Sequence, residues 1–113
     1  MEFQKQAIRE KISQNGWKII ELEKAELDWW AGEMWRLESV WSPVGATAHI
    51  TFLLEPEDME YVWEIMLSEE KPDSRFGNFS LSLKGWEKEL PEFLRHLDDI
   101  RNRQNQKSVL NSI

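Results

Sequence analysis

Two long runs of residues flank the tetrapeptide Ser42-Pro43-Val44-Gly45, and both are rich in aromatic and β-branched side chains. Proline at the second position of this tetrapeptide and glycine at the fourth favour a type I turn. A turn between two runs of this composition is typical of an antiparallel β-hairpin. This hairpin constrains the fold of the chain more than any other feature of the sequence.

The alternation of side chains in the two runs predicts how they pair. If the turn places Trp41 opposite Ala46, one face of the hairpin is apolar and the other is polar. The inward pairs are then Ser39 with Ala48, Leu37 with Ile50, and Trp35 with Phe52. Shifting the pairing by one residue would scatter apolar groups over both faces, so burial favours the first register.

The same register predicts a polar face on which a histidine lies beside a carboxylate. One row across this face contains Arg36, Thr51 and Glu64, and the next contains Glu38, His49 and Met66. A Glu-His pair is the minimum for a general base or a weak metal site, since the carboxylate orients the ring and favours its charged form. Without a second histidine or a nucleophile nearby, we expect a solvated ion pair instead. We therefore predict no catalytic residue, no metal site and no cofactor.

Residues 57–68 fit either a strand or a helix. As a strand, the segment extends the hairpin, and its pairs with the preceding strand are Leu54 with Tyr61, Phe52 with Trp63, and Ile50 with Ile65. As a helix, it would begin at Pro56 with acidic residues at its positive end. The order of elements would then resemble that of small secretion chaperones. We favour the strand, because its side chains alternate in step with the neighbouring strand.

The remaining elements follow from local patterns. Residues 2–14 carry an amphipathic helical stripe that Asn15-Gly16 ends. Residues 17–23 form a strand whose apolar residues do not keep one parity, which indicates a bulge. Residues 79–83 alternate as a last strand, and the closing helix begins near Pro91, with Trp86 in a leading turn.

These elements predict an α+β fold with an N-terminal helix, an antiparallel meander of four or five strands and a C-terminal helix. Both helices cover one face of the sheet, which leaves the other face to solvent, a ligand or a partner. We expect one domain over residues 1–104. A polar tail, residues 105–113, follows it, and its composition leaves it free to be disordered.

Four of the seven tryptophans fall between residues 29 and 43. The register sends Trp35 into the core, in a row with Phe52 and Trp63. Trp41 lies at the hairpin end, where it could close the core or line an opening. Adjacent strand residues point to opposite faces, so either Trp29 or Trp30 should be exposed, and an exposed tryptophan is typical of an interaction surface.

The charge and composition exclude several functions. A net charge of −7 without a basic cluster argues against binding nucleic acid, and no segment is apolar enough to cross a membrane. The absence of cysteine is consistent with a cytoplasmic protein.

We predict a non-catalytic interaction domain that binds another protein, or a second copy of itself, through an open sheet face, a sheet edge or its acidic surface. The alternative is a small-molecule or carbohydrate-binding protein with a tryptophan-lined pocket, or an enzyme that uses Glu38 and His49.

Overall fold

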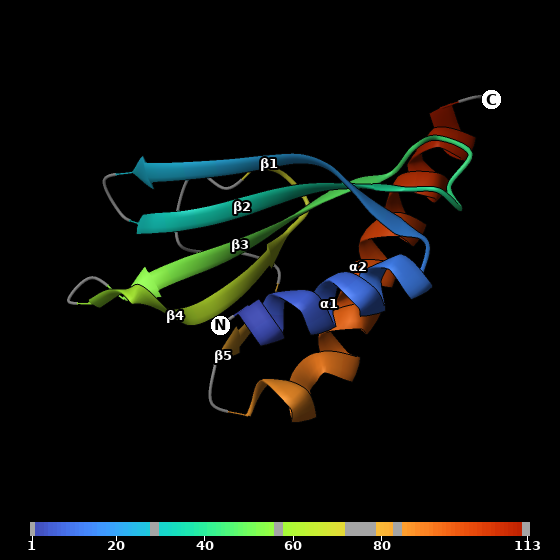
Figure 1. The fold of residues 1–113 in the computed structure, drawn as a ribbon. Helices are drawn as coiled ribbons and strands as arrows, with labels where there is room; N and C mark the ends of the chain where they lie inside the picture. Colours follow the sequence, from blue (N-terminus) through green and yellow to red (C-terminus); the bar gives the residue numbers. More distant parts are fainter. Residues whose placement is uncertain (1, 28–29, 56–57, 72–78, 83–84, 112–113) are drawn as a thin grey trace.

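The computed structural model describes residues 2–27, 30–55, 58–71, 79–82 and 85–111. For residues 2–3, 25–27, 30–31, 55, 58–63, 82 and 108–111 the description covers the backbone only. The elements in chain order are α1 (Glu2–Gln14), β1 (Trp17–Leu27), β2 (Trp30–Ser39), β3 (Thr47–Glu55), β4 (Asp58–Ser68), β5 (Phe79–Ser82) and α2 (Trp86–Asn111). The strands form one antiparallel sheet in the order β1-β2-β3-β4-β5. The predicted α+β meander is therefore confirmed (Figure 1).

Two expectations about individual strands are confirmed with it. Residues 58–68 form β4, so the helical alternative does not apply, and neither does the resemblance to secretion chaperones. The bulge expected in the first strand lies between Ile19 and Glu21, where the pairing of β1 with β2 shifts. This bulge lets β1 keep Trp17 and Ile19 on one side and continue beyond them with the opposite parity.

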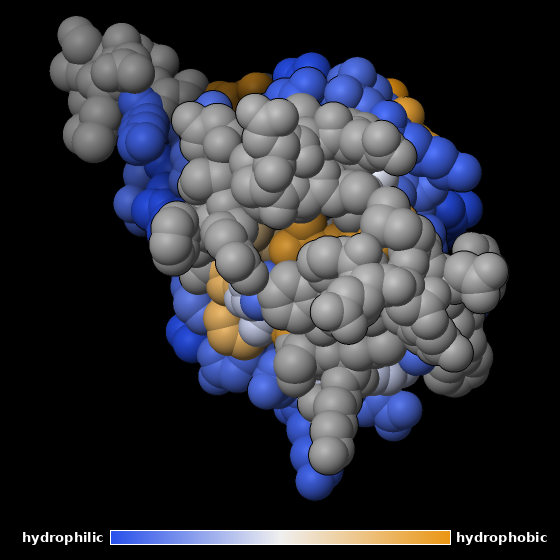
Figure 2. All heavy atoms as spheres, turned by 90° about the vertical axis from the view of Figure 1, so that its left-hand side faces the viewer, coloured by the Kyte–Doolittle hydropathy of each residue, from blue (hydrophilic) through white to orange (hydrophobic). Residues whose placement is uncertain are grey.

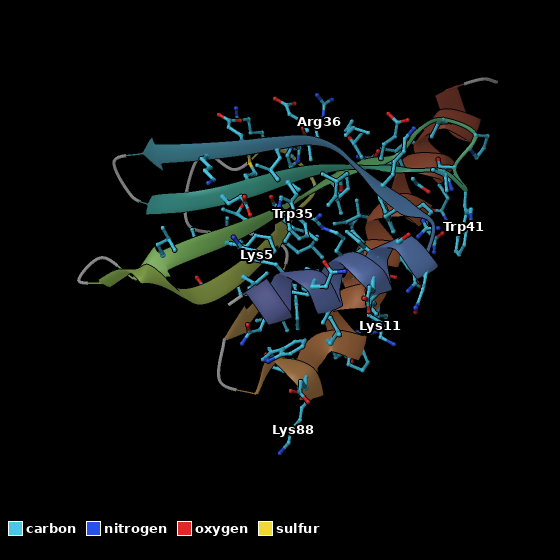
Figure 3. The ribbon with its side chains drawn as sticks, viewed as in Figure 1. Lys5, Lys11, Trp35, Arg36, Trp41 and Lys88 are labelled. Carbon is cyan, nitrogen blue, oxygen red and sulfur yellow. The ribbon has the colours of Figure 1, made fainter. Side chains whose placement is uncertain are left out.

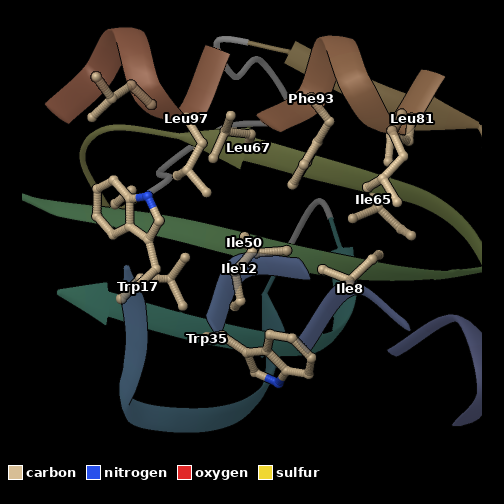
Figure 4. Close-up of a cluster of buried hydrophobic side chains, with 14 of the residues drawn as sticks. Ile8, Ile12, Trp17, Trp35, Ile50, Ile65, Leu67, Leu81, Phe93 and Leu97 are labelled. Atoms are coloured by element: carbon tan, nitrogen blue, oxygen red, sulfur yellow. The ribbon is translucent and has the colours of Figure 1, made fainter. Parts of the chain in front are cut away.

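Both helices pack against one face of the sheet, which we call the inner face. Figure 1 shows α1 and α2 together beneath the sheet, with β1 to β4 extending past them. The helices and the sheet share one buried cluster (Figure 4), whose members include Ile8 and Ile12 of α1, Phe93 and Leu97 of α2, and Trp35, Ile50 and Leu67 of the sheet. A single apolar core thus joins all parts of the fold.

Trp35 lies at the centre of this core, as predicted. Its side chain has no exposed surface and points into the space between the sheet and α1 (Figure 3). The ring meets Phe52 edge to face, with 4.6 Å between the ring centroids and 61° between the planes. Its indole N–H donates to Glu33 at 3.3 Å, and Glu33 pairs with Lys5 of α1 at 2.9 Å. The polar end of this large side chain is therefore satisfied at the margin of the core.

The predicted pairing of β2 with β3 is wrong by two residues. The turn itself is present, since the Gly45 N–H donates to the Ser42 carbonyl at 3.2 Å. However, Ser39 and not Trp41 lies opposite Ala46, because the N–H of Val40 leaves the hairpin and donates to the carbonyl of Gly16 at 2.8 Å. A shift of two preserves parity, so the inward side chains stay the same although their partners change.

The pairing of β3 with β4 is displaced in the same way. Phe52 lies opposite Ile65, and Ile50 lies opposite Leu67. The predicted row of Trp35, Phe52 and Trp63 is therefore wrong, because Trp35 lies opposite Ile50 and Phe52 lies opposite Ile65. The side chain of Trp63 lies outside the described residues.

The C-terminal helix starts earlier than predicted. α2 begins at Trp86, directly after Gly85, and Pro91 lies inside it. Proline at this position removes one helical hydrogen bond in the second turn of the helix, the one that an N–H at position 91 would donate to the Glu87 carbonyl. The helix continues to Asn111, through most of the segment assigned to the tail. Neither α1 nor α2, the helices in the described part of the chain, is long and apolar enough to cross a membrane.

The cysteine-free chain allows a direct test of the hairpin register. Glu38 lies opposite Thr47, so we expect a Glu38→Cys/Thr47→Cys variant to form an intramolecular disulfide on mild oxidation. The Glu38→Cys/His49→Cys variant is the matched control, because those two residues are diagonal neighbours at roughly 7–8 Å. Thiol titration and mass spectrometry measure the cross-link. Efficient cross-linking of the control pair instead would restore the register predicted from the sequence.

Candidate functional site

The sheet face opposite the helices, the outer face, is partly covered. Its side chains Met34, Thr51 and Met66 are buried. The chain leaves β4 at Ser68 and crosses this face toward β1, where the Lys71 ammonium lies 3.1 Å from the carboxylate of Glu23. The outer face is therefore a groove with a polypeptide wall rather than a flat open surface.

A cleft of about 330 Å³ lies on the outer face beside this wall. Its floor consists of Met34 and Arg36 of β2 and Thr47 and His49 of β3, and its sides are formed by Glu21 and Glu23 of β1 and by Glu70 and Lys71. Figure 3 shows Arg36 pointing away from α1, as this position requires. Two of the residues predicted for the polar face, Arg36 and His49, meet in this cleft.

The predicted rows of polar residues are not formed. His49 lies opposite Arg36, and Glu38 lies opposite Thr47, because the hairpin register differs by two residues. The other members of the rows also have new partners, since Thr51 lies between Met34 and Met66, and Glu64 lies opposite Leu53. The predicted Glu38–His49 pair, on which the alternative of an enzyme with a general base depended, is therefore not formed, and His49 is paired with Arg36 instead.

His49 is held as a neutral ring. Its side chain is only 7% exposed, and the Glu69 carbonyl lies 3.2 Å from Nδ1. A carbonyl can only accept a hydrogen bond, so Nδ1 carries the proton and Nε2 is the acceptor in the neutral ring. Burial lowers the pKa of His49, and the Arg36 charge lowers it further, against the opposing effects of the Glu69 carbonyl and the Glu70 carboxylate.

Two side chains of α2 hold the floor and the polypeptide wall of the cleft. The amide of Gln104 accepts from the Thr47 N–H at 3.0 Å and donates to the Thr47 carbonyl at 2.7 Å. Arg103 pairs with the carboxylate of Glu69 at 3.1 Å. Sequence reasoning missed both residues, because polar side chains at the end of a helix normally face solvent.

The other sequence-predicted residue with a distinctive environment is Trp41. One face of its ring packs on Gly16, where an added Cβ atom would lie 2.2 Å from the ring. The Arg101 guanidinium lies 5.0 Å from the ring centroid of Trp41 and 4.8 Å from that of Trp17. These contacts hold the ring of Trp41 in place, yet 61% of the residue is exposed.

Trp41 belongs to an exposed apolar group at the end of the sheet. Residues 40–45, which join β2 to β3, form what we call the hairpin tip. Val40 is 58% exposed and Val44 is 43% exposed. The hydroxyl of Ser42 donates to the side-chain oxygen of Asn105, which ties the tip to α2. The tip therefore presents three apolar side chains from a backbone that is anchored at both of its flanks.

The Trp29-Trp30 pair stays a prediction. Trp29 lies outside the described residues, and Trp30 is described only by its backbone, which pairs with Leu27 of β1.

Comparison with known proteins gives no relative. No protein-family model matches the chain, and no curated protein or solved structure is significantly similar to it. Within the described ranges, no three histidine or carboxylate side chains are grouped so that they could hold a metal ion. The function must therefore be inferred from the cleft and the hairpin tip themselves.

The buried neutral His49 predicts a pH dependence of stability. Its pKa is lowered in the folded protein, so the unfolded chain binds the proton more readily and stability falls as the pH drops from about 6.5 through the folded pKa. We expect His49→Asn, which keeps a donor for the Glu69 carbonyl but does not titrate, to lose less stability over this range. Urea unfolding at about pH 7.5 and about pH 5.5 measures the difference. Equal losses in both proteins would show that His49 is not held neutral.

The packing of Trp41 on Gly16 predicts a coupled effect on stability. Gly16 has a φ of 78°, so Gly16→Ala introduces both backbone strain and a clash with the ring. We expect a loss of about 1–3 kcal/mol for strain alone and more with the clash. Because Trp41→Ala removes the clash, the double variant should lose less than the sum of the single variants in a double-mutant cycle. Strict additivity would contradict the contact.

Proposed function

We propose that this protein is a non-catalytic domain that binds a partner protein through its hairpin tip. The observation that carries the proposal is the environment of Trp41, whose ring contacts Gly16 and Arg101 although 61% of the residue is exposed. Tryptophan is enriched among the few residues that supply most of the affinity of protein interfaces. A ring already held in one orientation loses little conformational freedom on binding.

The residues that pack against Trp41 include two buried N–H groups without hydrogen-bond partners among the described residues, which lower the stability of the fold. We take this loss of stability as support for a function of the exposed ring. Arg101 and Trp17, which lie behind it, each keep a buried N–H group, the Nε of arginine and the Nε1 of the indole. Neither group has a hydrogen-bond partner within the described part of the chain. An unsatisfied buried donor costs roughly 1–3 kcal/mol. Aliphatic side chains could close this end of the sheet without that cost.

The other apolar residues of the hairpin tip also suit the binding of a partner protein. Val40 and Val44 of the same short connection are also exposed apolar residues. The outer face is less suited to a large partner, because residues 69–71 already cross it. Three of the five large apolar residues that are exposed in the described part of the chain belong to the hairpin tip, and the other two, Ile20 and Leu22, lie on β1.

The charge of the chain indicates the chemistry of the partner. The net charge is −7. Figure 2 views the opposite end of the sheet, where β1 and β3 finish, and the described residues at the margin of that view are mainly hydrophilic. Charges around an interface act mainly on the rate of association. We infer a partner that offers an apolar pocket for Trp41 within a basic rim.

The proposal is tested by comparing the wild-type protein with Trp41→Ala as immobilised baits in a lysate of the source organism. Proteins retained by the wild type alone are purified, and their binding is measured by biolayer interferometry. We expect Trp41→Ala to weaken binding by about 30-fold or more, which corresponds to the roughly 2 kcal/mol typical of a hot-spot residue. Added salt should slow association, whereas Trp41→Ala should speed dissociation.

Leu22→Ala is the matched control, since Leu22 is an apolar residue of β1 with a similar exposed fraction, 49%. It should bind like the wild type, and thermal unfolding should show that Trp41→Ala is folded. The proposal fails if every retained protein binds Trp41→Ala and the wild type equally.

A further inference from the structure

The cleft on the outer face is a second, independent feature, and its shape is stabilised from both sides. Its polypeptide wall, residues 69–71, is tied to α2 by the Arg103–Glu69 ion pair and to β1 by the Lys71–Glu23 ion pair, each at 3.1 Å. The floor is tied to α2 by the double hydrogen bond between Gln104 and Thr47. The cleft is thus part of the folded structure and lies apart from the hairpin tip.

The cleft holds an arginine whose hydrogen-bonding capacity is not used up. The guanidinium of Arg36 carries five N–H donors in a planar fork. Its ion-pair partner in the described part of the chain is Glu21, and the closest approach is 3.8 Å, which is beyond hydrogen-bond distance. The geometry leaves the fork able to bind a carboxylate in the bidentate mode that arginine favours.

Acceptors lie close to this donor. Neutral His49 presents an acceptor at Nε2, and the carboxylate of Glu70 is near enough to act on the His49 ring. Together they form a place for an ammonium group, which donates three hydrogen bonds and accepts none. Opposite charges are therefore available to a ligand within one small cleft.

The balance of charge in the cleft favours a ligand that carries both a positive and a negative charge. Its lining contains two cations, Arg36 and Lys71, and three carboxylates, those of Glu21, Glu23 and Glu70. An inorganic anion would face three carboxylates, and a cation would face two positive charges. A molecule that carries one charge of each sign can meet both sets of groups at the same time.

The size and the floor of the cleft limit the rest of the ligand. A volume of about 330 Å³ is at the lower end of the roughly 300–1,000 Å³ found for small-molecule sites. The floor also contains Met34, whose flexible apolar side chain adapts to different shapes. These features fit a small molecule with a short apolar group.

We propose that this cleft binds a free α-amino acid or a similarly small zwitterion, with Arg36 on its carboxylate and with His49 and Glu70 on its ammonium group. The site goes beyond partner binding at the hairpin tip and does not depend on it. Trp41→Ala should therefore leave amino-acid binding unchanged.

The test uses the purified full-length protein and the standard L-amino acids, each added singly up to about 10 mM, a concentration that nearly saturates a site with a Kd of about 1 mM. The imidazole resonances of His49 in NMR spectra report binding. We expect at least one amino acid with an apolar side chain to give a saturable shift. L-leucine is then compared with 3-methylbutylamine and 4-methylpentanoate, which lack its carboxylate and its amino group. Each analogue should bind at least about tenfold more weakly than the amino acid.

Arg36→Gln should weaken the binding of the amino acid at least about tenfold, whereas Arg95→Gln, which removes an exposed arginine from α2, should have no effect. Thermal unfolding confirms that both variants are folded. The proposal is overturned if no amino acid gives a saturable shift. Equal binding of the amine or of inorganic phosphate would also overturn it, and so would unchanged affinity in Arg36→Gln.

Discussion

One turn of α2, residues 101–105, contacts four residues that are distant from it along the chain. Its side chains make polar contacts 34 to 86 residues away, with Asn15 at the end of α1, Ser42 in the hairpin tip, Thr47 at the start of β3 and Glu69 after β4. The apolar core holds the helices against the sheet, and its members Trp17, Ala46 and Leu67 lie close to these contacts along the chain. The polar contacts of this turn add to the core next to both of the surfaces to which we assign a function.

The contact between Gln104 and Thr47 explains where the sheet ends. β4 makes its last pair with β3 at His49 and Ser68, so the N–H and C=O groups of Thr47 on that side need other partners. The side-chain amide of Gln104 supplies one acceptor and one donor, as a further strand residue would. The chain after Ser68 is thereby free to cross the outer face, and this crossing creates the cleft around His49 and Arg36.

The alternation of apolar and polar residues predicted the faces of the sheet correctly and its pairing incorrectly. Trp35, Leu37 and Ile50 are buried as expected, because a strand places every second side chain on the same face. The pattern repeats every two residues, so it cannot distinguish registers that differ by two. The bond between Val40 and the Gly16 carbonyl selects one of them, and it joins segments that the hairpin pattern does not connect.

The sequence by itself determined the order of helices and strands, the single apolar core and the residues that point away from it. Turn residues, helical stripes and strand alternation are local signals, and each acts within about one element. Only the tertiary structure decided that His49 faces Arg36 and the Glu69 carbonyl. It also decided that the Trp41 ring contacts Gly16 and Arg101 while most of the residue stays exposed. These environments are made by side chains from different elements, and the geometry that brings them together depends on a register that local patterns leave undetermined.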